Sequence, residues 1–332
     1  MKTSLRSLAV RGVDALPPGL GRQVRTLVGR PGPREIGIDA LDAELSRATA
    51  LMVTSPERAQ ALLGEFVVAP PASPPPDPFS DPYRQWTWDL YRRISGRETY
   101  ETAHEASPFD LERALARPFP YESGSLKLVG RDLVARGHLL DTLSKALRVV
   151  HGSAPARPRV VEFGAGWGNL TADLVATGLD VTVVELDPKF CDLIAQRCAN
   201  GPGALSVQRG DMLDFTTDEP FDAAVFYESF HHCADHLALL EGLHRVVRPE
   251  GVVLFAAEPV QRLAYPWGPR LDGLSVWSSR THGWLELGFD TRYFDAALAR
   301  TGWKGRRVGL GARPSETDVL LADAQRSTEP VQ

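Results

Sequence analysis

The amino-acid sequence predicts an α/β fold built around a mostly parallel β-sheet, with a helical extension ahead of it. From residue 159, short apolar segments alternate with helical segments of about ten residues, an order typical of strands buried between two layers of helices. The first apolar segment, RVVEF, runs directly into the glycines of GAGWG. The last two segments, 303–311 and 317–324, follow each other without a helix, which predicts a closing antiparallel pair.

Each element of the α/β region follows from its own residue pattern. Strands are short apolar runs, whereas helices place apolar residues at helical spacing. The predicted strands are RVVEFGAG, LDVTVVELD, ALSVQRGD, FDAAVFYES and VVLFAAEP. The predicted helices are NLTADLVATG, PKFCDLIAQRCAN, HLALLEGLHRVVRPEG and TRYFDAALARTG.

The chain ahead of this region has a different organisation. Residues 1–66 begin with a basic stretch and continue with helix-period apolar positions, which predicts a helical, partly mobile region. Residues 67–82 contain seven prolines and are predicted to form a stiff, extended linker. Residues 83–150 return to an amphipathic pattern and are expected to be a helical cap on the domain 151–332.

The composition excludes several classes of function. A net charge of −5 on 332 residues gives no reason to expect a nucleic-acid partner. Three cysteines form neither a disulfide framework nor a CxxC metal site, which fits a reducing cytoplasm. No apolar run is long enough to span a bilayer, and the basic N-terminus lacks the apolar core of a signal peptide. The oligomeric state is not predicted.

The glycine turn after the first strand predicts a ligand site. Gly164, Gly166 and Gly168 stand where a strand turns into a helix, and backbone N–H groups are available for a ligand at such turns. A dinucleotide fingerprint would have its third glycine one place later, where this chain has Asn169. The missing glycine argues against a pyrophosphate ligand and therefore against a nicotinamide-dependent oxidoreductase, which remains an alternative.

Two acidic residues indicate what the ligand is. Glu185 ends the second strand, where a carboxylate can accept hydrogen bonds from two ribose hydroxyls. Asp211 follows the third strand, where it can meet the amino group of an adenine. Together with the glycine spacing, these acids predict an adenosine ligand that lacks a pyrophosphate.

The run from Val160 to Pro259 resembles the class I S-adenosylmethionine-dependent methyltransferases in its motifs VVEFGAGWGN, VVELD, GDML and RVVRPEG, in the family's order. The resemblance implies a Rossmann-like sheet of seven strands with an antiparallel last strand. It also implies S-adenosyl-L-methionine as the cofactor. The residues expected to contact this donor are Glu162, Gly164, Gly166, Gly168, Asn169, Glu185, Asp211, Met212 and Tyr227.

The stretch YESFHHCADH first suggests a metal site, because Glu228, His232 and His236 would share one face of a continuous helix. The fourth strand ends near Tyr227, however, and Asp235 is a natural N-cap for the next helix. The continuous helix is therefore not expected, and no metal site is predicted. His236 is expected in the first helical turn, in contact with solvent.

The remaining pair, His231 and His232, is expected beside the sulfonium of the donor. A hydroxyl acceptor is a poor nucleophile, and a base with a pKa near 7 contributes about 10²–10⁴-fold. His232 is the favoured base, although paired histidines here also serve as packing residues in the resembled family. Glu228 and Glu258 end neighbouring strands and are further catalytic candidates, which could bind substrate hydroxyls, orient the histidine or help it hold a divalent ion.

The connection 260–289 is too long for an ordinary loop, and such loops are usually functional. Its aromatic and arginine side chains suit sugar faces, hydroxyls or phosphate, or they close a lid over the core. The predicted substrate-binding residues are Tyr121, Trp267, Trp277, Arg280 and Trp284.

ESFHHCADH, FAAEP and SVWSSRTHGWLELGF resemble methyltransferases associated with polysaccharide and glycoconjugate synthesis. The sequence therefore predicts an O-methyltransferase acting on a saccharide hydroxyl, with a small-molecule or oligosaccharide acceptor as its partner. A methyltransferase of small natural products and a non-catalytic metal- or nucleoside-binding scaffold remain alternatives.

Overall fold

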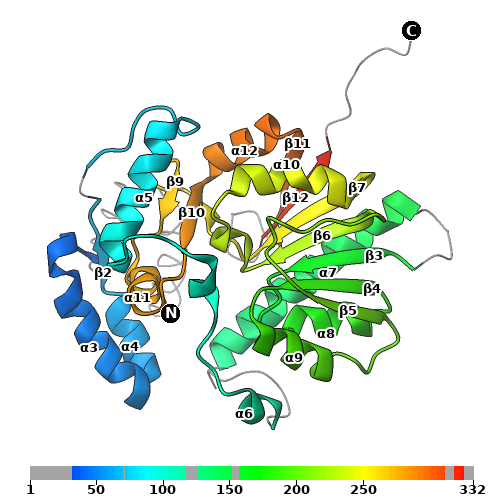
Figure 1. Ribbon diagram of the computed structural model, residues 1–332, viewed down its shortest axis with the longest axis horizontal. Helices are drawn as coiled ribbons and strands as arrows, with labels where there is room; N and C mark the ends of the chain where they lie inside the picture. Colours follow the sequence, from blue (N-terminus) through cyan, green and yellow to red (C-terminus); the bar gives the residue numbers. More distant parts are fainter. Residues whose placement is uncertain (1–31, 71, 117–125, 152–156, 311–317, 325–332) are drawn as a thin grey trace, which may run out of the picture. The chain divides into compact units, whose positions relative to one another are not determined.

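The computed structural model describes residues 32–70, 72–116, 126–151, 157–310 and 318–324. The chain divides into two compact units (Figure 1). Unit 1 contains the chain up to His104 and the segment Val260–Tyr293. Unit 2 contains Glu105–Pro259 and the chain from Phe294 onward. The predicted cap 83–150 is thus shared between the units, and the predicted loop 260–289 belongs with the N-terminal residues.

Unit 2 is built on a seven-stranded sheet in the order β11-β12-β7-β6-β3-β4-β5. The strands are β3 (Arg159–Phe163), β4 (Asp180–Glu185), β5 (Ala204–Arg209), β6 (Phe221–Tyr227), β7 (Val247–Ala256), β11 (Trp303–Val308) and β12 (Val319–Ala324). Strand β12 runs antiparallel to both of its neighbours, and the pairs among β3 to β7 are parallel. This arrangement confirms the predicted mostly parallel sheet with an antiparallel last strand.

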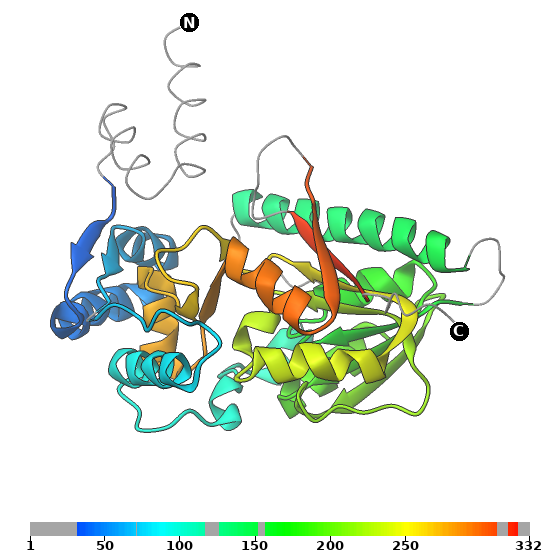
Figure 2. The same ribbon diagram turned by 90° about the horizontal axis from the view of Figure 1, so that it is seen from above.

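Helices cover both faces of this sheet, as Figure 2 shows for α7 and α10. The helical elements that lie wholly or partly in unit 2 are η2 (Thr102–Glu105), α6 (Leu111–Leu115), α7 (Leu126–His151), α8 (Asn169–Ala176), α9 (Pro188–Arg197), η3 (Phe230–His232), α10 (His236–Val246) and α12 (Thr291–Arg300). Alternate strand residues face opposite layers. Val160 and Val181 pack in one buried cluster with leucines of α7, α8 and α9. On neighbouring strands the rings of Phe163, Phe226 and Phe255 stack in a row, with centroids 5.0 and 5.3 Å apart.

Unit 1 combines N-terminal helices with the segment from the middle of the chain. Its elements are β1 (Arg34–Ile36), η1 (Ile38–Ala40), α3 (Leu41–Thr54), α4 (Pro56–Leu63), β2 (Phe66–Val68), α5 (Asp81–Ser95), β8 (Val260–Gln261), β9 (Trp267–Pro269), α11 (Gly273–His282) and β10 (Leu287–Asp290). β1 pairs with β2, and β10 lies between β8 and β9. Val276 of α11 completes a buried cluster with Leu41, Phe66, Leu90 and Ile94, so the two parts of the unit share one core.

Two expectations about these segments are corrected by the structure. The connection 260–289 is not a loop, since it contains three short strands and a helix. The proline-rich stretch 67–82 begins inside β2 and ends inside α5, where a proline occupies the first turn of the helix and Ser80 is the N-cap. Proline is tolerated there because the first helical N–H groups have no partner within the helix. In the part of the chain that the structure describes, no helix has the length and apolarity to cross a membrane.

Candidate functional site

Three adjacent strands of unit 2 end in residues with left-handed backbone. Gly164 follows β3 with φ 66°, Glu228 follows β6 with φ 52°, and Ala257 follows β7 with φ 56°. Among the described residues, Glu228 and Ala257 are the non-glycine positions with positive φ. Such conformations cost free energy in residues with a side chain and concentrate at functional sites. The carboxyl edge of the sheet is therefore the place to look for chemistry.

The predicted glycine loop lies at this edge, and each glycine is needed for a different reason. A Cβ at Gly164 would lie 2.7 Å from the Cβ of Ser229, so the loop after β6 approaches too closely for a side chain. Gly168 has φ 73° and is the N-cap of α8. Gly166 has φ 51°, and a Cβ there would meet nothing within 4 Å. Open space therefore adjoins the middle of the loop.

Glu185 lies at the predicted place and is tied to the glycine loop. Its Oε2 accepts the N–H of Gly166 at 2.9 Å. Its Oε1 accepts the N–H groups of Leu186 at 2.8 Å and Asp187 at 3.1 Å. Burial raises the pKa of Glu185, against the effect of these backbone bonds. The carboxylate thus connects the end of β4 to the glycine loop.

Glu162 and Asn169 lie on either side of this loop. Glu162 is buried, and its Oε2 accepts a 2.7 Å hydrogen bond from the hydroxyl of Thr171. Burial raises the pKa of Glu162 to about 7, with a smaller contribution from Glu185. The Oδ1 atom of Asn169 is buried and has no hydrogen-bond partner. Because buried acceptors are normally paired, this oxygen fits a ligand that brings a donor.

The predicted adenine residues flank the loop from β5. Asp211 is half-buried, and its carboxylate accepts the N–H of Leu213 at 2.9 Å. The Cε of Met212 would lie 3.9 Å from a Cβ built at Gly164. The flexible thioether therefore reaches the glycine loop, where it can pack against a flat apolar ring.

The sequence prediction missed a polar network from α7. The hydroxyl of Tyr227, a predicted donor contact, donates to Asp132 at 2.7 Å. Arg136 is 2% exposed and donates to Asp132 at 3.0 Å, to the carbonyl of Asn169 at 3.3 Å and to Asp173. Burial and the bond to Asp132 raise the pKa of Tyr227. The sequence gives no signal for this network, because it does not show that Arg136 is buried or that Asp173 lies beside it.

The first predicted base, His231, is held by Glu258. The Nδ1 atom of His231 lies 2.7 Å from Oε2 of Glu258, and the side chains are 7% and 1% exposed. Glu258 also accepts the N–H groups of Ser229 at 2.8 Å, Phe230 at 2.8 Å and His231 at 3.2 Å. Burial alone would raise the pKa of Glu258, but the charge and hydrogen bond of His231 outweigh it, so the pKa is lowered. Glu258 thus holds the whole turn after β6.

The second predicted base, His232, has a partner that the sequence prediction missed. Its Nδ1 lies 2.9 Å from Oε2 of Glu105, and the side chains are 23% and 13% exposed. The centroids of the His231 and His232 rings are 4.3 Å apart. The site therefore contains two adjacent imidazole–carboxylate pairs. Glu228, the remaining catalytic candidate, is exposed to solvent.

The rest of the histidine stretch agrees with the prediction except at one position. Residues 230–232 form a short 3₁₀ turn, and Asp235 caps α10 by accepting the N–H of Ala238 at 3.1 Å. The expectation that His236 contacts solvent is wrong. It is 2% exposed, because the first turn of α10 packs inward and brings its ring against Phe230. Across the described ranges, no three His, Cys, Asp or Glu side chains form a group able to hold a metal ion.

Predicted acceptor residues that the structure describes lie in unit 1. Trp267 is buried and donates from Nε1 to the carbonyl of Pro78 at 2.9 Å. Trp277 donates to Thr49 at 3.0 Å, and Trp284 stacks on His282 with ring centroids 4.6 Å apart. The predicted contact Tyr121 lies outside the described residues.

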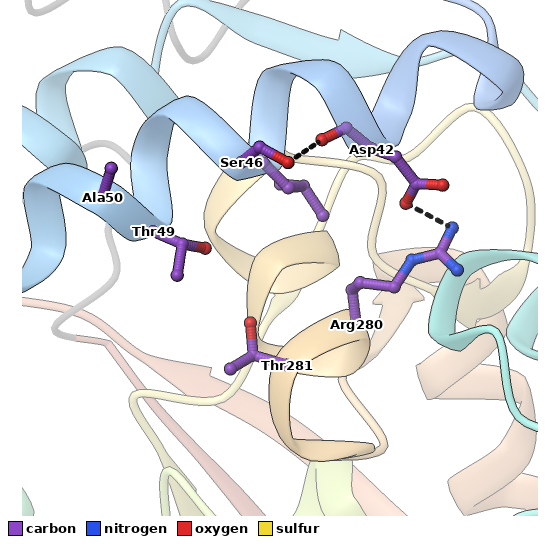
Figure 3. A pocket seen from close by; sticks show the side chains of 7 residues that line it. Asp42, Ser46, Thr49, Ala50, Arg280 and Thr281 are labelled. Atoms are coloured by element: carbon purple, nitrogen blue, oxygen red, sulfur yellow. Dashed lines mark hydrogen bonds and ion pairs between the residues drawn. The ribbon is translucent and has the colours of Figure 1, made fainter.

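The predicted acceptor residue Arg280 lines a cavity of about 540 Å³ in unit 1. Figure 3 shows this cavity, which is lined by residues of α3 and α11. In it, Arg280 pairs with exposed Asp42 at 3.3 Å. A guanidinium beside hydroxyl-bearing residues suits a polar or anionic group.

Comparisons with known proteins agree with this geometry. Residues 161–255 match the family profile described as "Methyltransferase domain". An uncharacterized methyltransferase of Oceanobacillus iheyensis is 32% identical over 103 residues, which are 30% of this chain and 46% of that protein. One of Staphylococcus carnosus is 41% identical over 80 residues, which are 24% of this chain and 36% of that protein. The chain thus spans less than half the length of these curated relatives.

Among solved structures, the N-methyltransferase NodS from Bradyrhizobium japonicum, in complex with S-adenosyl-L-homocysteine, is 20% identical with a TM-score of 0.40. The similarity covers 64% of this chain and 94% of that one. The residues matched by the family profile run from β3 into β7 and include the glycine loop, Glu185 and both paired histidines. Residues 161–255 are therefore similar to methyltransferase domains.

Proposed function

We propose that the protein transfers a methyl group from S-adenosylmethionine to a hydroxyl group of a saccharide. The observation that carries this proposal is the close approach of the histidine turn to the glycine loop. A Cβ at Gly164 would lie 2.7 Å from that of Ser229, whose hydroxyl donates to the carbonyl of Phe163 at 2.6 Å. His231 and His232 follow Ser229 in the same turn, after Phe230, so both histidines belong to the turn that borders the glycine loop.

The residues around the glycine loop fit the donor in their chemistry. The orphaned Oδ1 of Asn169 and the open space at Gly166 suit the ammonium of the methionine part. Glu185 suits the ribose hydroxyls, and Asp211 with Met212 suits the adenine. When bound, the donor supplies a methyl group on a sulfonium, whose sulfur keeps the electron pair of the broken C–S bond. These residues hold the donor, and the histidines act on the acceptor.

His232 is the proposed general base. A carboxylate can only accept a hydrogen bond, so Glu105 holds the proton on Nδ1 of His232 and makes Nε2 the atom that can take another. That nitrogen would take the hydroxyl proton as the oxygen forms its bond to the methyl carbon, a contribution of about 10²–10⁴-fold. His232 suits this role better than His231 because its side chain is 23% exposed rather than 7%.

The saccharide acceptor is supported by the polar character of this edge. Glu228 is exposed and held in a left-handed conformation directly after β6, where a carboxylate can accept hydrogen bonds from acceptor hydroxyls. The proposed catalytic set is therefore His232 and His231 with Glu228 and Glu258. Trp267, Trp277, Arg280 and Trp284 remain predictions for acceptor binding, as do the boundaries 1–66, 67–82, 83–150 and 151–332 for the domains.

The proposal is tested in two steps. Calorimetry should detect binding of S-adenosylmethionine and none of NAD; the opposite result would remove the donor assignment. Labelled S-adenosylmethionine should then transfer its methyl group to members of a saccharide panel and not to matched phenols or amines. Transfer to phenols alone would replace the saccharide by a natural-product acceptor. Donor binding without transfer to any acceptor class would favour a non-catalytic scaffold.

A further inference from the structure

The segment Glu105–Phe109 contacts both sides of the candidate site. At its first residue, the carboxylate of Glu105 bonds Nδ1 of His232 at 2.9 Å, across 127 positions in the chain. The segment begins at the last residue of η2 and ends before α6, and both bonded side chains are largely buried. A hydrogen bond between a carboxylate and an imidazole nitrogen fixes the orientation of the ring, and the negative charge of the carboxylate stabilises a positive charge on it.

The other end of the segment is anchored beside the donor loop. The N–H of Ser107 donates to Asp187 at 2.9 Å, and the ammonium of Lys189 donates back to the carbonyl of Ser107 at 2.6 Å. The ring of Phe109 lies 4.9 Å from that of Trp167, which belongs to the glycine loop, and 4.6 Å from that of Phe190. The five residues Glu105–Phe109 therefore join the glycine loop to the imidazole.

We infer that Glu105 is a positioning residue for methyl transfer and that its segment couples donor binding to the placement of His232. The inference rests on the proposed role of His232 as base. Asp187, which holds Ser107, also donates its N–H to Glu185 at 3.1 Å. A donor that contacts Glu185 and the glycine loop would therefore contact residues connected to the segment at two points. These points are Ser107, which is bonded to Asp187, and Phe109, which packs on Trp167. Glu105 then keeps the proton on Nδ1 of His232 and presents Nε2 to the acceptor.

The charged and titratable groups near His232 determine the pH dependence of kcat/KM, which tests the inference. They include Glu105, the adjacent ring of His231 and its partner Glu258, while Glu228 at the end of β6 interacts electrostatically with His231. Removal of the Glu105 charge takes away a carboxylate that favours the protonated imidazole. The pH at which kcat/KM is half-maximal should therefore move to lower pH. A purely structural pair would change stability without this movement.

The experiment compares Glu105→Gln, Glu105→Ala and Glu105→Asp with the matched control Glu112→Gln, an exposed position on α6. Glu105→Ala should lower kcat about 10- to 100-fold, with KM for the acceptor and donor affinity changed less than about 3-fold. Glu105→Gln should show an intermediate loss and the lowered half-maximal pH, and Glu105→Asp should recover part of the rate. Glu112→Gln should match the wild type.

The coupling is tested by NMR, which does not depend on an active acceptor. The ring signals of His232 should move when S-adenosylhomocysteine binds, and Phe109→Ala should abolish this movement while the variant still folds. Wild-type kcat and pH profile in a folded Glu105→Ala variant would overturn the inference. Absence of transfer by the wild type would instead remove the proposed function, while the NMR titration would still report whether Glu105 and the donor control His232.

Discussion

The two imidazole–carboxylate pairs have the same chemistry but different surroundings. His231 and Glu258 are separated by 27 positions and are almost fully buried. The carboxylate of Glu258 also accepts hydrogen bonds from three backbone N–H groups. His232 and Glu105 are separated by 127 positions and keep some exposure to solvent. The first pair fixes the turn after β6, whereas the second brings a distant segment to the proposed base. The difference teaches that adjacent identical residues can have different structural surroundings, which suits them to different roles.

The largest expected effect comes from breaking the buried pair. Glu258→Ala should lower the free energy of unfolding by about 3–5 kcal/mol, because it leaves His231 and the backbone donors of the turn without their buried acceptor. Glu105→Ala should cost less, about 1–3 kcal/mol, because the side chains of this pair are less completely buried than those of His231 and Glu258. Urea denaturation followed by tryptophan fluorescence and circular dichroism measures both. Equal losses would remove the distinction between the pairs.

The next effect separates the histidines by activity. His232→Asn should reduce kcat by about 10²–10⁴-fold with little change in stability, because it removes the proposed base and leaves the turn in place. His231→Asn should lose about 1–3 kcal/mol of stability from the unsatisfied carboxylate, with a smaller loss of kcat. Single-turnover rates and melting curves on the same preparations test this. The reverse pattern would assign the base to His231.

The third effect contrasts Glu258 with Glu162, a buried carboxylate whose pKa is shifted in the opposite direction. The pKa of Glu162 is raised from 4.5 to about 7, so its contribution to stability is complete below pH 4.5 and is lost as the pH rises to about 7. The full change is about 3 kcal/mol. The lowered pKa of Glu258 has the opposite consequence, because its contribution is present above pH 4.5 and is lost at more acidic pH.

Melting temperatures of the donor-free protein between pH 5 and 8 test this contrast. Glu162→Gln should flatten the decline of stability over this range and stabilise the protein at pH 8. The matched change at exposed Glu219, Glu219→Gln, should retain the wild-type profile. If the stability of Glu162→Gln fell with rising pH as steeply as that of the wild type, ionisation of Glu162 would not be the cause of the decline.

Most of unit 2 could be predicted because its signals are local. The run RVVEF followed by glycines predicted β3 and the glycine loop, and the positive φ angles of Gly164, Gly166 and Gly168 explain why glycine is favoured at those places. The N-cap at Asp235 was predicted for the same reason, since it depends on residues within one turn. Local patterns therefore predicted the fold of unit 2 and the place of the glycine loop in it.

The parts that could not be predicted depend on contacts between distant residues. Glu105 has no pattern that points to His232, because only the folded chain brings them together. Helix α11 is not evident from the sequence, since GLSVWSSRTH has a weak apolar pattern, although Asp272 and Gly283 cap its two ends. The burial of His236 is not evident either, because burial of a first helical turn depends on the residues packed against it.

The division of unit 1 between two stretches of sequence has a consequence for synthesis. Domains commonly fold in order as they leave the ribosome, the first one before the next is complete. Here Leu41, Phe66 and Ile94 need Val276 to close their shared core, and Val276 is translated only after the glycine loop, both histidines and the strands β3 to β7. The apolar side chains of the N-terminal residues therefore stay exposed to solvent while most of unit 2 is synthesised. Nascent chains of this protein should accordingly require chaperone protection until about residue 290 has emerged.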